Sequence, residues 1–148
     1  MSYGSLSPVA VEAINRGARL GGCLHNSSEG GLAAAHRHGG ALVFQIGTGY
    51  CGCRDESGRF SLERLPERLE EAPVRALEIK LSQGAKPGLG GLLPAAKVTE
   101  EIARIRGVPA FRDCASPAFH SAFSDVDTLI ERRHQDIRGR AAAAGEAG

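Results

Sequence analysis

Residues 78–94 read EIKLSQGAKPGLGGLLP, an apolar run that passes into a loop with four glycines and two prolines. Lys80 lies inside the run, and Gln83 and Lys86 follow it. Side chains alternate along a strand, so Lys80 points away from the face of Ile79. Glycines let backbone N–H groups approach an anion closely. The stretch predicts a strand that ends at a site for a carboxylate or a phosphate-bearing cofactor. On spacing alone, a surface loop with solvated lysines explains it equally well.

The rest of the chain repeats this alternation of apolar runs and loops. Further strands are expected at residues 41–46 and 74–81, with a short apolar step before residue 26. Helices are expected at residues 8–21, 62–69, 101–106 and 125–134, the first capped by Ser7, the third by Thr99 and the last by Ser124 with Asp127. Strands that alternate with helices favour an α/β fold with a parallel sheet, whose ligands bind at the carboxyl ends of the strands.

Two other loops carry polar groups after apolar runs. NSSEGG, residues 26–31, offers Glu29 to orient a ligand amine or to transfer a proton, although an ordinary turn with an exposed acid is the simpler interpretation. Gln45 lies at the end of the strand over residues 41–46, where its amide can hydrogen-bond a flat heterocycle.

Alternative chemistries are less favoured. Three i,i+2 pairs offer metal ligands, but one intervening residue is tight for zinc, so no metal is expected. They are Cys23/His25, His36/His38 and Cys51/Cys53. Cys114, His120 and Asp113 contain the residue types of nucleophilic catalysis, yet no G-x-S-x-G elbow occurs.

Composition limits the class of protein. The 148 residues suit one domain, and 18 basic against 17 acidic residues argue against a nucleic-acid partner or a membrane surface. The start, MSYGSLSP, has no secretory pattern, and four cysteines form no dense disulfide framework, so a cytoplasmic location is expected. Residues 135–148 are alanine-rich and are expected to be a disordered tail.

Four segments together resemble one family. They are MSYGSLS at residues 1–7, HNSSEGG at 25–31, LVFQIGTGY at 42–50 and EIKLSQGAKPGLGGLLPAAKVTEEIARIRGVP at 78–109. They are similar to the FMN-binding synthase domain of glutamate synthase, particularly its shorter, glutaminase-free relatives. The resemblance covers residues 1–134 and implies a partial (β/α)8 TIM barrel of about the first four βα units. It also implies FMN at the barrel mouth, where 2-iminoglutarate, formed from 2-oxoglutarate and ammonia, is reduced to glutamate.

The resemblance also implies roles for individual residues. Glu29 and Lys80 are the expected catalytic pair, and Gln83 and Lys86 are expected to bind the dicarboxylate substrate. The residues expected to line the flavin are Gly4, Ser5, Asn26, Gln45 and Lys80.

The sequence departs from the family in its extent. A complete barrel takes about 250 residues, whereas this chain supplies about four strands. The family's later strands and iron–sulfur cysteines would lie beyond residue 134, and its segment before MSYGS is missing. We therefore expect a truncated, inactive fragment with two exposed sheet edges. Ferredoxin or a reductase subunit, and a glutaminase, are expected partners of the full-length parent. The alternative is a small metal- or anion-binding module without redox chemistry.

Overall fold

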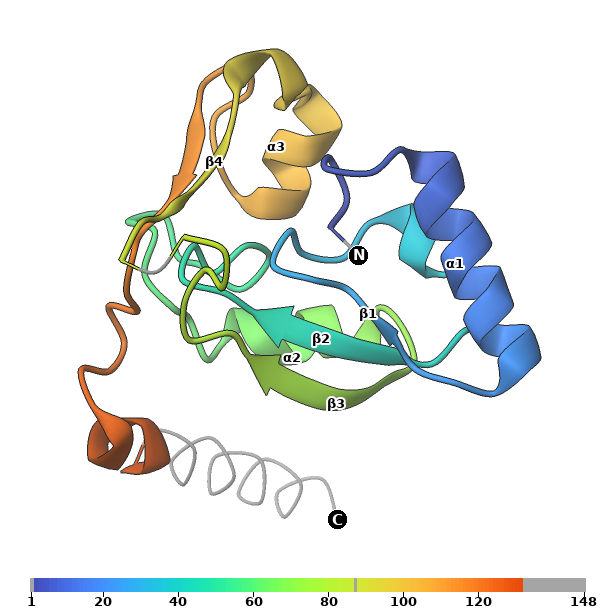
Figure 1. Cartoon of the computed structure of the whole chain (residues 1–148), viewed down its shortest axis with the longest axis horizontal. Coiled ribbons are helices and arrows are strands. Elements are labelled where there is room, and N and C mark those ends of the chain that lie inside the picture. Colours follow the sequence, from blue (N-terminus) through green and yellow to red (C-terminus); the bar gives the residue numbers. More distant parts are fainter. Residues whose placement is uncertain (1, 87, 132–148) are drawn as a thin grey trace.

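The computed structural model describes residues 2–86 and 88–131 (Figure 1). The helices are α1 (Pro8–Gly21), α2 (Arg64–Glu70) and α3 (Glu100–Arg106), with short 3-10 helices η1 (Ala34–His36) and η2 (Ala95–Lys97). The strands are β1 (His25–Asn26), β2 (Leu42–Ile46), β3 (Val74–Ile79), β4 (Gly91–Leu93) and β5 (Cys114–Ser116). Within the described residues, no helix is long and apolar enough to cross a membrane.

Local signals set the ends of α1. The Ser7 hydroxyl accepts a hydrogen bond from the backbone N–H of Ala10 at 3.3 Å, and Pro8 occupies the first turn, where a missing N–H costs nothing. Gly22 ends the helix in the left-handed conformation, with φ of +63°. The predicted helix at residues 8–21 is confirmed.

The other predicted helices are present with shifted ends or a different cap. Thr99 caps α3 as expected, its hydroxyl accepting from the N–H of Ile102. The helix expected at residues 62–69 is displaced by one to two residues. Residues 126–131 are helical, but the capping by Ser124 with Asp127 is wrong, because the Asp125 carboxylate accepts from the N–H of Thr128 at 2.8 Å. The expected tail at residues 135–148 lies outside the described residues.

Three parallel strands form the main sheet in the order β1-β2-β3. The predicted strands at 41–46 and 74–81 are confirmed, with the second ending at Ile79. Leu42, Phe44 and Ile46 point to one face, where they pack with Leu65 of α2. Figure 1 shows α2 crossing this face of the sheet.

Polar side chains occupy the opposite face. Gln45 pairs with Glu78 in the parallel ladder, and paired residues share a face. Lys80, two residues after Glu78, continues that face beyond the end of β3. The sheet therefore has an apolar face against α2 and a polar face that leads to the carboxyl ends of the strands.

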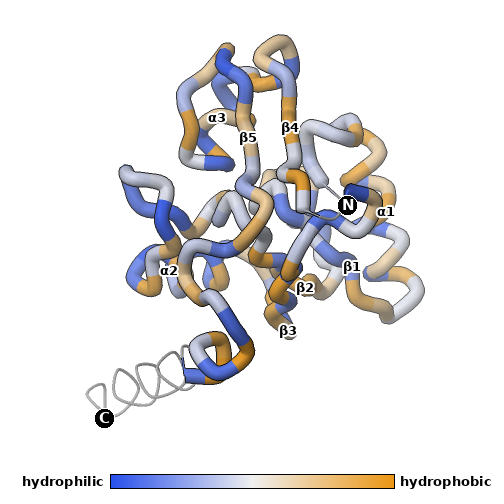
Figure 2. The backbone as a smooth tube through the Cα atoms, turned by 60° about the vertical axis from the view of Figure 1, so that its left-hand side comes forward, coloured by the Kyte–Doolittle hydropathy of each residue, from blue (hydrophilic) through white to orange (hydrophobic). Residues whose placement is uncertain are grey.

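A second layer follows the parallel sheet. β4 and β5 pair antiparallel and lie side by side in Figure 2, and α3 packs beside them through Ile102 and Leu93. The α/β class and the parallel sheet are confirmed, but four βα units are not. Among the described residues, three strands are parallel, and the chain after α3 returns antiparallel to β4 rather than beside β3.

Candidate active site at the ends of the parallel strands

Three predicted site residues meet in one hydrogen-bonded group, which we call the Glu29 cluster: Glu29, Lys80 and Gln83. Lys80 Nζ lies 3.0 Å from Glu29 Oε2 and 2.9 Å from Gln83 Oε1. Gln83 Nε2 donates to both oxygens of Glu29, at 3.0 and 2.9 Å. Each member therefore contacts the other two, although they lie 51 and 54 residues from Glu29 in the chain.

The strand ends position this cluster. The N–H of Lys80 donates to the carbonyl of Ile46 at 2.9 Å, which continues the β2–β3 pairing by one residue. Glu29 follows β1 in a loop where Ser28 has φ of +59° and its N–H bonds to Asn26 Oδ1. Gly47, after β2, leaves space for Glu29, because a β-carbon there would lie 2.7 Å from Glu29 Cβ.

The cluster is partly shielded from water. The side chains of Lys80 and Glu29 are 27% and 19% exposed. The charges of the Glu29 carboxylate and the Lys80 ammonium balance each other. Gln83 donates to both Glu29 oxygens, including Oε1, to which the ammonium does not bond. A charge-assisted cluster of this kind can orient a carboxylate, an amine or a transferring proton.

A second polar group lies on the same face of the sheet, before the strand ends, and centres on Glu78. Its carboxylate accepts from Asn26 Nδ2 at 3.0 Å and from the Gln45 side-chain amide. These three residues come from β1, β2 and β3, so the group spans the sheet. Gln45 Oε1 is buried and has no hydrogen-bond partner among the described residues. A buried acceptor without a partner suits a ligand that donates a hydrogen bond.

Glu78 was missed by the sequence reasoning. The signal was present, since Glu78 lies two residues before Lys80 and must share its face. What the sequence lacked was the register that brings Asn26 and Gln45 beside it.

The remaining predicted residues lie outside both groups. A β-carbon at Gly4 would lie 3.1 Å from Ile102 Cδ1, so this residue faces α3, and Ser5 is exposed. Lys86 is exposed, and its backbone N–H bonds to the carbonyl of Gln83 at 3.3 Å. Their roles toward flavin or substrate stay predictions.

The alternative sites gain no support from the geometry. Within residues 2–86 and 88–131, no group of three or more His, Cys, Asp and Glu side chains is arranged to hold a metal ion. Asp113 accepts from the N–H of Ala95 at 2.7 Å, whereas His120 bonds with Tyr50 and the carbonyl of Lys80. Asp113 and His120 therefore do not form a catalytic relay with Cys114.

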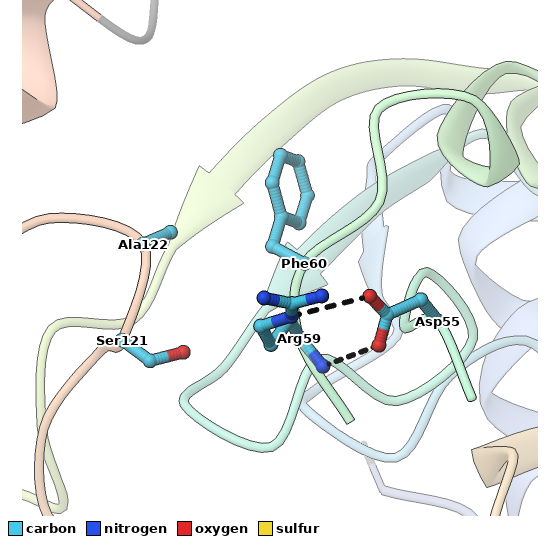
Figure 3. A pocket seen from close by; sticks show the side chains of 5 residues that line it. All are labelled: Asp55, Arg59, Phe60, Ser121 and Ala122. Atoms are coloured by element: carbon cyan, nitrogen blue, oxygen red, sulfur yellow. Dashed lines mark hydrogen bonds and ion pairs between the residues drawn. The ribbon is translucent and has the colours of Figure 1, made fainter. Parts of the chain in front are cut away.

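One surface pocket lies apart from both polar groups. It has a volume of about 280 Å³ and is lined by Asp55, Arg59, Phe60, Ser121 and Ala122 (Figure 3). Arg59 turns toward Asp55, with Nε 3.5 Å from Oδ2. The pKa of Asp55 is lowered to about 2, first by the Ser57 hydroxyl and then by the N–H of Arg59. These charges are already satisfied within their own loop.

Parallel strands that end in a cluster of charged and amide side chains define an α/β protein whose candidate site lies at its strand ends. Comparison with known proteins narrows this class. A family profile described as a conserved region in glutamate synthase matches residues 1–138. The chain belongs to this glutamate synthase family.

Individual relatives agree with the family. A glutamate synthase large subunit-like protein, YerD, of Bacillus subtilis is 41% identical over 133 residues, which are 88% of this chain and 25% of the relative. An archaeal glutamate synthase [NADPH] of Archaeoglobus fulgidus is 41% identical over 88% of this chain and 24% of the relative. An archaeal-type glutamate synthase [NADPH] of Thermotoga maritima is 38% identical over 87% and 23%. The chain thus spans about a quarter of the length of these relatives.

Proposed function

We propose that this chain forms the first part of the FMN and substrate site of a glutamate synthase. The reaction is the FMN-dependent reduction of 2-iminoglutarate, formed from 2-oxoglutarate and ammonia, within a (β/α)8 barrel. The observation that carries the proposal is the Glu29 cluster, which unites a carboxylate, an ammonium and an amide at the ends of parallel strands. The names of the relatives support the same chemistry.

The polar face of the sheet fits a flavin. Gln45 Oε1, buried and without a partner among the described residues, offers an acceptor to an N–H or O–H donor of the ligand. Asn26 and Glu78 flank it, and Lys80 supplies positive charge at the strand end. In our proposal Asn26, Gln45 and Lys80 hold FMN, with Gly4 and Ser5 completing the site. The chemistry that bound FMN supplies is hydride transfer.

In our proposal the Glu29 cluster binds the substrate and transfers a proton. Lys80 and Gln83 can exchange their bonds to Glu29 for bonds to a substrate carboxylate, which places the substrate beside that side chain. Lys86 adds a second cation from the following turn. Glu29 then lies next to the reacting carbon, where its carboxyl group holds or delivers a proton.

The complete activity would need segments of the relatives that lie outside the quarter of their length matched by this chain. We propose that the isolated chain does not catalyse the reaction. The strand that carries Glu78 and leads into Lys80, β3, is an outer strand of the sheet and is mostly exposed to water. Cytoplasmic ammonia assimilation, an iron–sulfur cluster, and electron supply by ferredoxin or a reductase subunit belong to the proposed full-length enzyme. A glutaminase partner would supply ammonia there.

Ligand binding tests the proposal without requiring turnover. FMN is titrated into the chain and followed by quenching of flavin fluorescence, and 2-oxoglutarate is then titrated by calorimetry. Lys80→Ala should weaken both affinities at least tenfold, as expected for loss of a charged hydrogen bond to a ligand. Lys97→Ala, which removes an exposed lysine outside the cluster, is the matched control. Absence of saturable binding of both ligands would refute the proposal for this chain and favour the metal- or anion-binding alternative.

A further inference from the structure

His120 connects the segment after β5 to the backbone of the candidate site. Its Nε2 lies 2.9 Å from the carbonyl oxygen of Lys80, 40 residues earlier in the chain. Its Nδ1 lies 3.0 Å from the hydroxyl of Tyr50. The ring therefore bridges the strand end that carries Lys80 and the loop that follows β2.

The partners define which nitrogen carries the proton. A carbonyl oxygen only accepts, so Nε2 must be protonated to bond with Lys80. Nδ1 of the neutral ring is then an acceptor and takes the proton of the Tyr50 hydroxyl. The same hydroxyl oxygen accepts from the N–H groups of Ser121 and Ala122, at 3.0 and 3.1 Å. Every group in this network has a partner of the right kind.

Packing keeps the network rigid. Tyr50 is 2% exposed, and its backbone has φ of +49°, so the surrounding structure enforces its placement. Phe123 stacks on the His120 ring with centroids 4.5 Å apart. Burial lowers the pKa of His120, which favours the neutral ring that the network requires.

Lys80 is thereby held on both sides of its α-carbon. Its N–H donates to the carbonyl of Ile46, and its own carbonyl accepts from His120. Since β3 ends at Ile79, the ladder itself does not fix the Lys80 carbonyl. Among the described hydrogen bonds, the His120 ring supplies the donor to that carbonyl.

We propose that His120, oriented by Tyr50, is a positioning residue that holds the Lys80 backbone so that Nζ stays on Glu29 and Gln83. The importance of this placement for the reaction rests on the proposed function, whereas the link between His120 and Lys80 is a separate physical claim. Among the described residues, His120 forms no hydrogen bond with the side chains of the Glu29 cluster.

Lysine reactivity tests the link without flavin or turnover. The chain has three lysines, Lys80, Lys86 and Lys97, and the last two are exposed references. Competitive labelling with limiting acetic anhydride at pH 8, read by mass spectrometry, gives the Lys80/Lys97 reactivity ratio. We expect His120→Phe, which can still stack on Phe123, to raise this ratio about fivefold, the scale of one lost hydrogen bond. His120→Gln, whose amide places a donor near the Nε2 position, should restore a ratio close to that of the wild type.

Control variants separate positioning from general loosening. Phe119→Ala alters a neighbouring side chain that is 70% exposed and should leave the ratio unchanged. An unchanged ratio in folded His120→Phe overturns the proposal, and so does a ratio in His120→Gln as high as in His120→Phe. Where His120→Phe does not fold, nitrogen NMR of the wild type decides. The Nε2–H tautomer at pH 7.5 supports the link and the Nδ1–H tautomer overturns it. Failure to bind FMN would refute only the proposed function.

Discussion

β2 and β3 are neighbouring strands of one sheet, yet they are buried very differently. In β2, LVFQI, buried and half-buried residues alternate, whereas in β3, VRALEI, all residues after Val74 are exposed. Phe44 and Leu77 are register partners on the same face, but they are 0% and 44% exposed. The difference arises because β2 lies between two strands and under Leu65 of α2, while β3 is the outer strand. Similar strand patterns therefore do not imply similar stabilisation.

Truncating the two register partners gives the largest expected contrast. Phe44→Ala should lower the free energy of unfolding by about 3–5 kcal/mol, because it empties a fully buried site. Leu77→Ala should cost about 1 kcal/mol, since nearly half of that side chain already contacts water. Urea denaturation of both variants measures the two values. Equal losses would mean that a partner or a second copy of the chain covers β3 in solution.

β1, the other neighbour of β2, should make stability depend on pH. The pKa of His25 is lowered to about 4, chiefly by burial and also by the nearby His36. Protonation therefore favours the unfolded chain, so stability is complete above the unfolded pKa near 6.5 and is lost as pH falls toward 4. The loss is about 3 kcal/mol over this window. Urea midpoints at pH 7.5, 6, 5 and 4 measure it. His120 acts in the same direction, and His25→Gln should flatten the profile. If the urea midpoint of His25→Gln still falls with pH as steeply as that of the wild type, groups other than His25 cause the pH dependence.

The loops after the two strands should differ in their tolerance of a β-carbon. Gly47→Ala, after β2, places that atom 2.7 Å from Glu29 Cβ and should cost about 1–3 kcal/mol. It should also raise the reactivity of Lys80, because Glu29 must move. Gly84→Ala, after β3, meets no atom within 4 Å and should stay within about 0.5 kcal/mol. Thermal unfolding of the pair checks this contrast, and a neutral Gly47→Ala would contradict the observed packing.

Lys80 itself should contribute little to stability. Lys80→Met removes a partly exposed ion pair, so the free energy of unfolding should fall by no more than about 1 kcal/mol. Anion binding, in contrast, should be lost in our proposal. Urea denaturation and ligand titration of the same preparation separate the two. A loss of several kcal/mol would assign the cluster a structural role.

Much of the local structure could be predicted because its causes are adjacent in the chain. The two ends of α1 are set by the backbone and side-chain geometry of Ser7, Pro8 and Gly22. Thr99 caps α3 in the same way. Apolar runs indicated β2 and β3, and the alternation of side chains along a strand placed Lys80 on the face opposite Ile79. The family membership followed from quoted motifs, chiefly residues 78–94, and is confirmed by the match over residues 1–138.

The amino-acid sequence by itself thus determined the ends of α1, the cap of α3, the strand periods, the family and the residue types of the candidate site. Only the tertiary structure decided that Glu29, Lys80 and Gln83 meet, that β4 pairs antiparallel with β5, and that His120 reaches the carbonyl of Lys80. The physical reason is the separation along the chain of the residues that interact. Caps and periodicity depend on neighbours a few residues away, whereas register, strand order and burial depend on which distant segments pack together.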